Sequence, residues 1–171
     1  NSAGTGAGLY ALNGSTSVRD CTFQNNEAFV DGGASYFEET ALTCESSSFS
    51  NNSAPDLGGA ILIHLCPQAS FLSIDCQQNS ASYGGCLFSS QTPAFLNESL
   101  FQDNVAVNDG GGVVFRNSSS AEITNCIFEG NSADFGGGLD FGSMEASQIE
   151  GTLFRGNTAL SNGGGCWVSE G

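Results

Sequence analysis

The chain is poor in basic residues and in the side chains on which catalysis usually depends. Its 171 residues include no lysine, three arginines and one histidine, against 18 aspartates and glutamates, and the formal net charge is −15. Nucleic-acid binding depends on clustered lysine and arginine, so this composition excludes a DNA- or RNA-binding role. No apolar run approaches the roughly 18–20 residues of a membrane-spanning helix, so we expect no direct membrane insertion by this segment.

What the chain does have is a repeat that fills it. An asparagine recurs at intervals of 25–27 residues, and a glycine pair follows each copy from Asn26 onward. In most copies a phenylalanine stands three residues before the asparagine and an alanine two residues after it. Periods of this length are typical of solenoids, propellers or arrays. The recurring asparagines are Asn1, Asn26, Asn52, Asn79, Asn104, Asn131 and Asn157.

The spacing within each copy predicts the fold. Apolar positions lie two or three residues apart with polar residues between them, which is typical of short half-buried strands. A period near 26 suits one turn of a parallel β-helix, whereas a propeller blade needs about 40 residues. We predict an all-β, right-handed parallel β-helix of six to seven coils over residues 1–171. Phenylalanines and alanines should face inward, asparagine amides should form a ladder, and glycines should turn the corners with positive φ.

Neither end of this β-helix shows the polar cap that normally blunts a terminal solenoid repeat. We therefore expect an uncapped fragment, an excerpt of a longer repeat protein.

The repeat resembles that of the chlamydial polymorphic membrane proteins, which pair the tetrapeptides GGA[ILV] and FxxN. GGAI occurs at 58–61, with relaxed versions at 32–35, 84–87, 110–113, 136–139 and 163–166. In the third copy Cys76 replaces the phenylalanine of FxxN, and the other copies keep the motif intact. The resemblance implies a surface-exposed adhesive or structural β-helix and carries over no catalytic residue.

The residues available for catalysis do not form a recognisable set. His64 is the only histidine, and Arg19, Arg116 and Arg155 occupy different positions of the repeat. Polysaccharide-cleaving β-helices use clustered aspartates with calcium and a basic residue, or paired carboxylates. We predict no enzymatic activity, no catalytic residue and no bound cofactor. The alternative is a polysaccharide-acting lyase or hydrolase-like β-helix whose catalytic turns lie outside this segment; an ice-binding solenoid would need a threonine ladder that is missing.

Four aspartates give a weak indication of calcium binding. They fall in the turn between the alanine and the glycines, where stacked carboxylates would attract a cation. Aspartate also suits such turns without any metal. These candidates are Asp31, Asp56, Asp109 and Asp134.

Most of the cysteines are expected to lie in the core. Cys21, Cys44, Cys76 and Cys126 occupy inward positions of the predicted coil, where they would act as small apolar residues. None of the four has a cysteine at the same position one turn away, so we expect no stacked disulfides. Cys66, next to a proline in a turn, is expected to be the most exposed thiol.

Four sequons are compatible with a secreted chain. Asn13, Asn51, Asn97 and Asn117 each begin an Asn-X-Ser motif at a turn or an outward position, where a glycan would not disturb the core. We therefore expect an extracellular or cell-surface location.

One apolar column suggests a contact surface. It follows the glycine pairs and should face outward, because the neighbouring column is more uniformly apolar and Asp140 would be badly placed inside. A register error of one residue would instead place this column in the core. The contact candidates are Tyr10, Tyr36, Leu62, Phe88, Val114 and Trp167.

An exposed apolar stripe indicates contact with a protein or a glycan. The predicted function is therefore a non-catalytic structural or adhesive rod at the cell surface. Its expected partners are a protein or glycan at that surface, or other subunits of an extracellular assembly.

Overall fold

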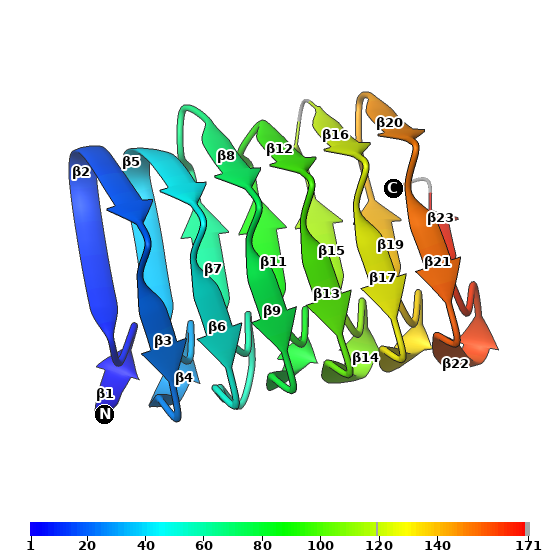
Figure 1. Ribbon diagram of the computed structural model, residues 1–171, viewed down its shortest axis with the longest axis horizontal. Helices are drawn as coiled ribbons and strands as arrows, with labels where there is room; N and C mark the ends of the chain where they lie inside the picture. Colours follow the sequence, from blue (N-terminus) through cyan, green and yellow to red (C-terminus); the bar gives the residue numbers. More distant parts are fainter. Residues whose placement is uncertain (119, 170–171) are drawn as a thin grey trace.

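The computed structural model describes residues 1–118 and 120–169 and shows a solenoid of short parallel strands (Figure 1). Paired residues on neighbouring strands are 25–27 positions apart, as between Asp75 and Leu100 or Leu100 and Ile127. About six coils follow one another at this spacing, and the described residues contain no helix. The predicted all-β fold and its repeat length are confirmed.

Each coil contributes strands to several walls. The first two walls belong to one eleven-stranded sheet, and β2 (Leu9–Arg19) and β5 (Ser35–Glu45) run through both. The remaining strands of the first wall are β7 (Ile61–His64), β11 (Leu87–Ser90), β15 (Val113–Arg116), β19 (Leu139–Gly142) and β23 (Cys166–Ser169). Those of the second wall are β8 (Ala69–Leu72), β12 (Ala94–Asn97), β16 (Ala121–Thr124) and β20 (Ser147–Glu150).

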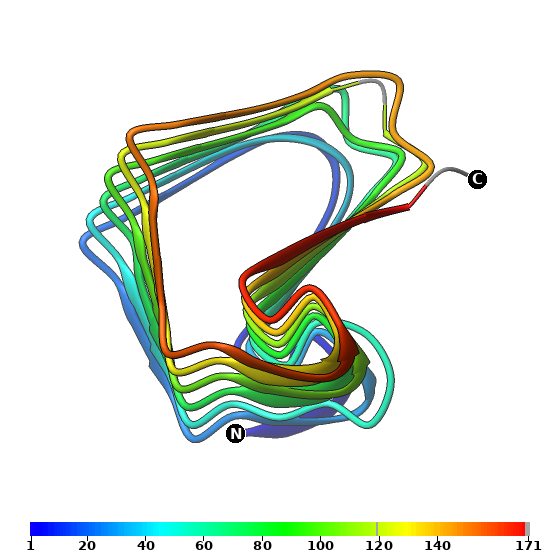
Figure 2. The ribbon, with the colours of Figure 1, turned by 90° about the vertical axis from the view of Figure 1, so that its right-hand side faces the viewer.

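The third wall is a six-stranded sheet, and the fourth consists of strands that lead back to the first wall. The third wall contains β3 (Thr22–Gln24), β6 (Ser48–Ser50), β9 (Asp75–Gln77), β13 (Leu100–Gln102), β17 (Ile127–Glu129) and β21 (Leu153–Arg155). The fourth contains β1 (Ser2–Thr5), β4 (Glu27–Asp31), β10 (Ser80–Tyr83), β14 (Val105–Asp109), β18 (Ser132–Phe135) and β22 (Thr158–Asn162). Figure 2 shows that the end of the fourth wall curls back toward the first.

The glycine pairs form the corner that leads into the first wall. Gly58 has a φ of 62°, a left-handed conformation that glycine adopts without steric cost. A Cβ on the next residue, Gly59, would collide with the carbonyl of Gly85 on the following coil. The first glycine therefore allows the turn, as the sequence predicted, and the second allows the coils to approach, which the sequence did not predict.

The asparagines form the predicted ladder. The backbone N–H and the Nδ2 of Asn79 both donate to Oδ1 of Asn104 at 3.0 Å, and Nδ2 also donates to the carbonyl of Phe49. The amide-to-amide contact recurs at each step from Asn26 to Asn157. Because these groups are buried in most coils, the ladder supplies bonds that water cannot provide there.

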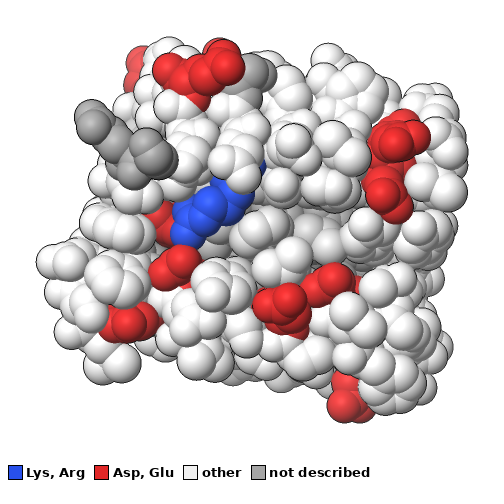
Figure 3. All heavy atoms as spheres, turned by 180° about the vertical axis from the view of Figure 1, so that it is seen from behind, with Lys and Arg blue, Asp and Glu red and all other residues white. Residues whose placement is uncertain are grey.

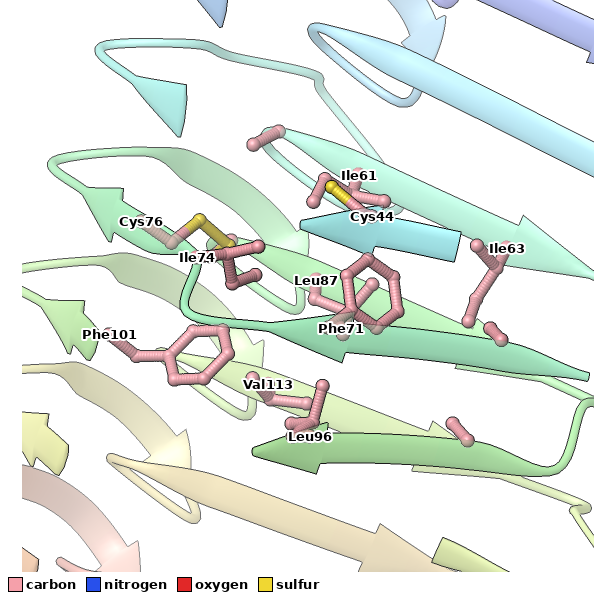
Figure 4. Close-up of a cluster of buried hydrophobic side chains, with 14 of the residues drawn as sticks. Cys44, Ile61, Ile63, Phe71, Ile74, Cys76, Leu87, Leu96, Phe101 and Val113 are labelled. Carbon is pink, nitrogen blue, oxygen red and sulfur yellow. A yellow bond between two sulfur atoms is a disulfide. The ribbon is translucent and has the colours of Figure 1, made fainter. Parts of the chain in front are cut away.

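The interior is filled by stacked apolar side chains. The ring of Phe128 is fully buried between those of Phe101 and Phe154, with centroid distances of 4.8 and 5.1 Å. Ile61 and Leu87 of the first wall face the same interior (Figure 4). The inward positions predicted for the phenylalanine and alanine columns are confirmed in the central coils.

The cysteines differ in part from expectation. Cys76 is buried as predicted, but it forms a disulfide with Cys86, with the Cα atoms 6.2 Å apart (Figure 4). Both residues are exceptions in the same coil, because Cys76 stands in a phenylalanine column and Cys86 in a column of alanine and glycine. That coincidence was the signal for the bond, since the two columns face each other across the core.

Two predictions about cysteines are wrong, those for Cys66 and Cys21, whereas Cys44 and Cys126 are buried as expected. Cys66 is buried because Leu65, with a φ of 53°, takes the exposed corner and turns the next residue inward. Its N–H donates to Thr92 Oγ1 at 2.9 Å. Cys21 is exposed because it lies on the first coil, which is covered on one side only.

Candidate functional site

The end of the fourth wall folds over the outer face of the first wall and buries part of it. We call this folded-back segment the hook; its successive positions are Asp31, Leu57, Tyr83, Asp109 and Phe135. Leu57 and Tyr83 pack on a second apolar cluster, separate from the main core, formed by Leu62, Phe88 and Val114. In a later coil Phe135 packs on Trp167, with ring centroids 4.7 Å apart.

The hook corrects the predicted contact stripe. The column faces away from the main core, as expected, but Leu62, Phe88 and Val114 are only 2%, 7% and 0% exposed. The prediction that they are exposed is therefore wrong, because the hook covers them. Tyr10 is exposed, and Tyr36 and Trp167 are partly buried. We missed the hook because its positions hold different residue types in different coils and so form no column.

A groove of about 390 Å³ remains open between the hook and the first wall. It crosses several coils on the face seen in Figure 3, where a patch of basic atoms lies among acidic patches. Its apolar lining consists of Tyr36, Leu57, Leu62 and Phe88. Its polar lining consists of Asp31, His64, Ser90, Arg116 and Asn117. This groove is the candidate functional site.

Arg116 closes one end of the groove. Its Nη2 donates to Asp109 Oδ2 of the hook at 2.8 Å and also contacts Asp140 Oδ2 on the next coil. The strand residue paired with Arg116 is Gly142, where any Cβ would collide with the guanidinium. Burial raises the pKa of Asp140 to about 6; Arg116 opposes this rise and Asp109 adds to it.

The other end of the groove is acidic. Asp31 Oδ1 accepts the backbone N–H of Leu57 at 2.9 Å, and burial raises the pKa of the Asp31 carboxyl. Glu38 pairs in register with His64 and accepts the hydroxyl of Tyr10 at 3.3 Å. Burial, followed by the nearby Glu38 carboxylate, raises the pKa of Tyr36 to about 12. Negative charge therefore concentrates where the groove begins.

The comparison with family models agrees with this architecture. The model described as "Right handed beta helix region" matches residues 5–171. The chain belongs to the right-handed β-helix family. No curated protein and no solved structure matches it. The likeness of this β-helix to chlamydial surface repeats remains a resemblance of motifs.

The four calcium candidates do not form one site in the β-helix. Asp31 and Asp109 hold the contacts described above, Asp134 accepts the hydroxyl of Ser161 at 2.6 Å, and Asp56 is exposed. Within residues 1–118 and 120–169, no three histidine, cysteine, aspartate or glutamate side chains are grouped to hold a metal ion. Nor does this part of the chain contain a helix able to span a membrane.

The sequons of the β-helix lie on its surface. Asn13, Asn51 and Asn117 are exposed at corners with φ of 62°, 53° and 52°, and Asn97 is partly exposed in β12. Ser119, the third residue of the last of these motifs, lies outside the described residues. Glycosylation at the four positions remains a prediction.

The groove offers binding contacts more readily than an acid–base pair. Asp140 is fully buried and cannot reach a ligand, and Asp109 is held by Arg116. The other two arginines are exposed and pair with partly buried glutamates on other faces, Arg19 with Glu45 and Arg155 with Glu129. His64 and Ser90 are the polar side chains left open between the two ends of the groove.

Proposed function

We propose that this β-helix is a non-catalytic structural or adhesive rod at the cell surface, and that its groove holds an extended partner. The observation that carries the proposal is the groove itself, which runs across coils along the rod with an apolar floor and a polar rim. The partner is a protein segment or a glycan, or another subunit of an extracellular assembly. A solenoid spreads such contacts over many coils.

The Cys76–Cys86 disulfide supports the extracellular location. Stable disulfides form and persist in oxidising compartments and are rare in the cytosol. Glycopeptide mass spectrometry of the native protein would test this part of the proposal. Glycans on Asn13, Asn51, Asn97 or Asn117 together with the intact disulfide are the expected result, and unmodified sequons with free thiols would contradict it.

A polysaccharide-acting β-helix whose catalytic turns lie outside this segment is the second candidate. The presence of His64 and Arg116 in one groove favours it, because these side chains can exchange protons with or bind an oxygen-rich substrate. Right-handed β-helices occur both in enzymes and in proteins without activity. For this reason the proposal rests on the groove and not on family membership.

Filling the groove tests its role. Ser90→Trp would place a large ring at the centre of the groove, and Ser50→Trp would make the same change on the third wall. We expect immobilised wild-type and Ser50→Trp protein to retain one member of a panel of polysaccharides and unfolded polypeptides. Ser90→Trp should lose that retention while keeping its thermal unfolding temperature. Equal retention by both variants would contradict the proposal.

A further inference from the structure

The charges around the groove indicate what kind of partner it accepts. Among the described residues Arg116 is the only arginine or lysine that lines it, and Arg116 is already contacted by the carboxylates of Asp109 and Asp140. The opposite end carries Asp31 and Glu38 with no basic side chain paired to them among the described residues. Asp31, Glu38, Asp109 and Asp140 place four carboxylates in or beside the groove against the one guanidinium of Arg116, so the formal charge around the groove is negative, as that of the whole chain is.

The shape of the groove suits an extended chain. It runs from the coil of Tyr36 to the coil of Arg116, and three coil steps of about 4.8 Å give a length of roughly 14 Å. An extended polypeptide advances about 3.3 Å per residue, so four to five residues would lie along it. Its partly exposed apolar lining, Tyr36 and Leu57, can hold the methylene stems of long side chains.

We propose that the groove binds a basic, extended polypeptide segment, with lysine or arginine side chains at the Asp31 and Glu38 end. The stems of these side chains pack along Tyr36 and Leu57, the partly exposed apolar residues of the lining, while their charged heads reach the carboxylates. His64 and Ser90 face the segment between the two ends and can hydrogen-bond its backbone. This inference rests on the proposed function, because it names the partner of the same groove.

Charge complementarity favours this occupant over the others. An acidic polysaccharide would meet the negative field of the groove and of the surrounding surface, where like charges oppose binding. A neutral glycan would gain nothing from Asp31 and Glu38 beyond ordinary hydrogen bonds. A basic segment gains from both carboxylates, and its affinity should fall as salt screens them.

The test is a titration of the β-helix with labelled peptides of about eight residues, longer than the groove requires. One peptide alternates lysine with leucine, a second alternates glutamate with leucine, and a neutral oligosaccharide is the third probe. We expect measurable binding of the lysine peptide alone, weakening as salt is raised. Binding of the glutamate peptide with equal affinity would overturn the proposal.

Two double variants that each remove two carboxylate charges test whether the charges at the groove matter. The double variant Asp31→Asn with Glu38→Gln keeps the Oδ1 acceptor for the N–H of Leu57 but removes both charges. It should weaken the binding of the lysine peptide about tenfold. Glu122→Gln with Glu150→Gln removes the same charge from the exposed second wall and should change binding less than about twofold. Equal effects of the two pairs would also overturn the proposal.

The outcomes separate this inference from the function on which it rests. If the lysine peptide fails to bind, but a glycan binds and is lost in Ser90→Trp, the basic partner is wrong and the binding rod stands. If a polysaccharide is cleaved with turnover, the proposed function itself is wrong.

Discussion

The carboxylate of Asp140, which has no exposed surface, lies against the guanidinium of Arg116 on the neighbouring coil. Neither oxygen of Asp140 accepts a hydrogen bond of good geometry, so the contact is chiefly electrostatic. Arg116 also bonds to Asp109, and the missing side chain of Gly142 leaves room for it. The buried pair of Asp140 with Arg116 thus lies within the first wall, and the partly exposed pair of Asp109 with Arg116 joins the hook to that wall, where other coils use apolar contacts.

The buried pair of Asp140 and Arg116 should make the free energy of unfolding depend on pH. The pKa of Asp140 is about 6 in the folded protein, above its ordinary value of 3.8, so the folded state binds the proton more tightly than the unfolded state. The free energy of unfolding should therefore rise as pH falls from about 6 to about 4, by up to about 3 kcal/mol from this group. Urea unfolding across this range is the measurement.

Two variants isolate the contribution of Asp140. Asp140→Asn should remove this rise and should be more stable than the wild type above about pH 7, because Arg116 keeps Asp109 as its partner. Glu122→Gln, on the exposed second wall, should reproduce the wild-type profile. If the difference in the free energy of unfolding between wild type and Asp140→Asn does not change with pH, burial does not raise the pKa of the Asp140 carboxyl.

The asparagine ladder should be most sensitive at its centre. Asn104→Ala would leave the buried N–H of Asn79 without its acceptor and would remove the Nδ2 bonds to the carbonyl of Cys76 and to the amide oxygen of Asn131, which still accepts the backbone N–H of residue 104. The orphaned N–H costs about 1–3 kcal/mol and each lost hydrogen bond about 0.5–1.5 kcal/mol, so we expect a loss of at least about 2 kcal/mol in urea unfolding. Asn157→Ala, at the partly exposed end of the ladder, should cost clearly less because water can replace its contacts. Equal losses would contradict the ladder's role.

The stack of phenylalanine rings should behave as a close-packed core. Phe128→Ala removes a fully buried ring between Phe101 and Phe154 and should cost about 3–5 kcal/mol. Phe95→Ala removes the same ring from the outer face of β12, where it is 37% exposed, and should cost far less. Chemical unfolding of both variants checks this, and a small loss at Phe128 would mean that the ring is not in the core.

The disulfide should stabilise the third copy of the repeat. Cys76→Ala with Cys86→Ala should lower the free energy of unfolding by about 2–4 kcal/mol, and peptide mapping without reductant should show the two residues linked. Cys76→Phe with Cys86→Gly copies the pairing of Phe101 with Gly112 one coil later, and should recover most of the loss. Free thiols in the map, or no recovery in that variant, would contradict this account of the core.

The sequence predicted the features that recur in every coil. The asparagine ladder, the inward phenylalanines and the left-handed glycines each repeat at a fixed position, because a parallel stack places equivalent residues above one another. A period of 26 residues was therefore enough to predict the main core. The sequence also predicted which side of the first-wall strands faces inward, since Ile61 and Leu87 belong to the main core whereas Asp140 contacts Arg116 on the outer side.

The features that the sequence did not reveal depend on contacts that do not repeat. Leu57 and Leu62 both belong to the second apolar cluster, although a glycine pair lies between them in the sequence. Their spacing along the chain matches neither the period of a strand nor that of a helix. Other coils fill the same positions with Asp31 and Tyr36, so no column marks the hook or the groove beneath it. Cys66 was placed outside because a proline follows it, whereas its orientation depends on the left-handed residue before it.

Binding without turnover is the property that most needs a direct measurement. The purified β-helix would be incubated for a prolonged period with neutral and acidic polysaccharides, with and without added calcium, and polymer length followed by size-exclusion chromatography and mass spectrometry. We expect every polymer, including any that the groove retains, to keep its original length. Products that accumulate in molar excess over the protein, and that are lost in His64→Ala or Arg116→Ala, would show that the groove is an active site and would contradict the rod.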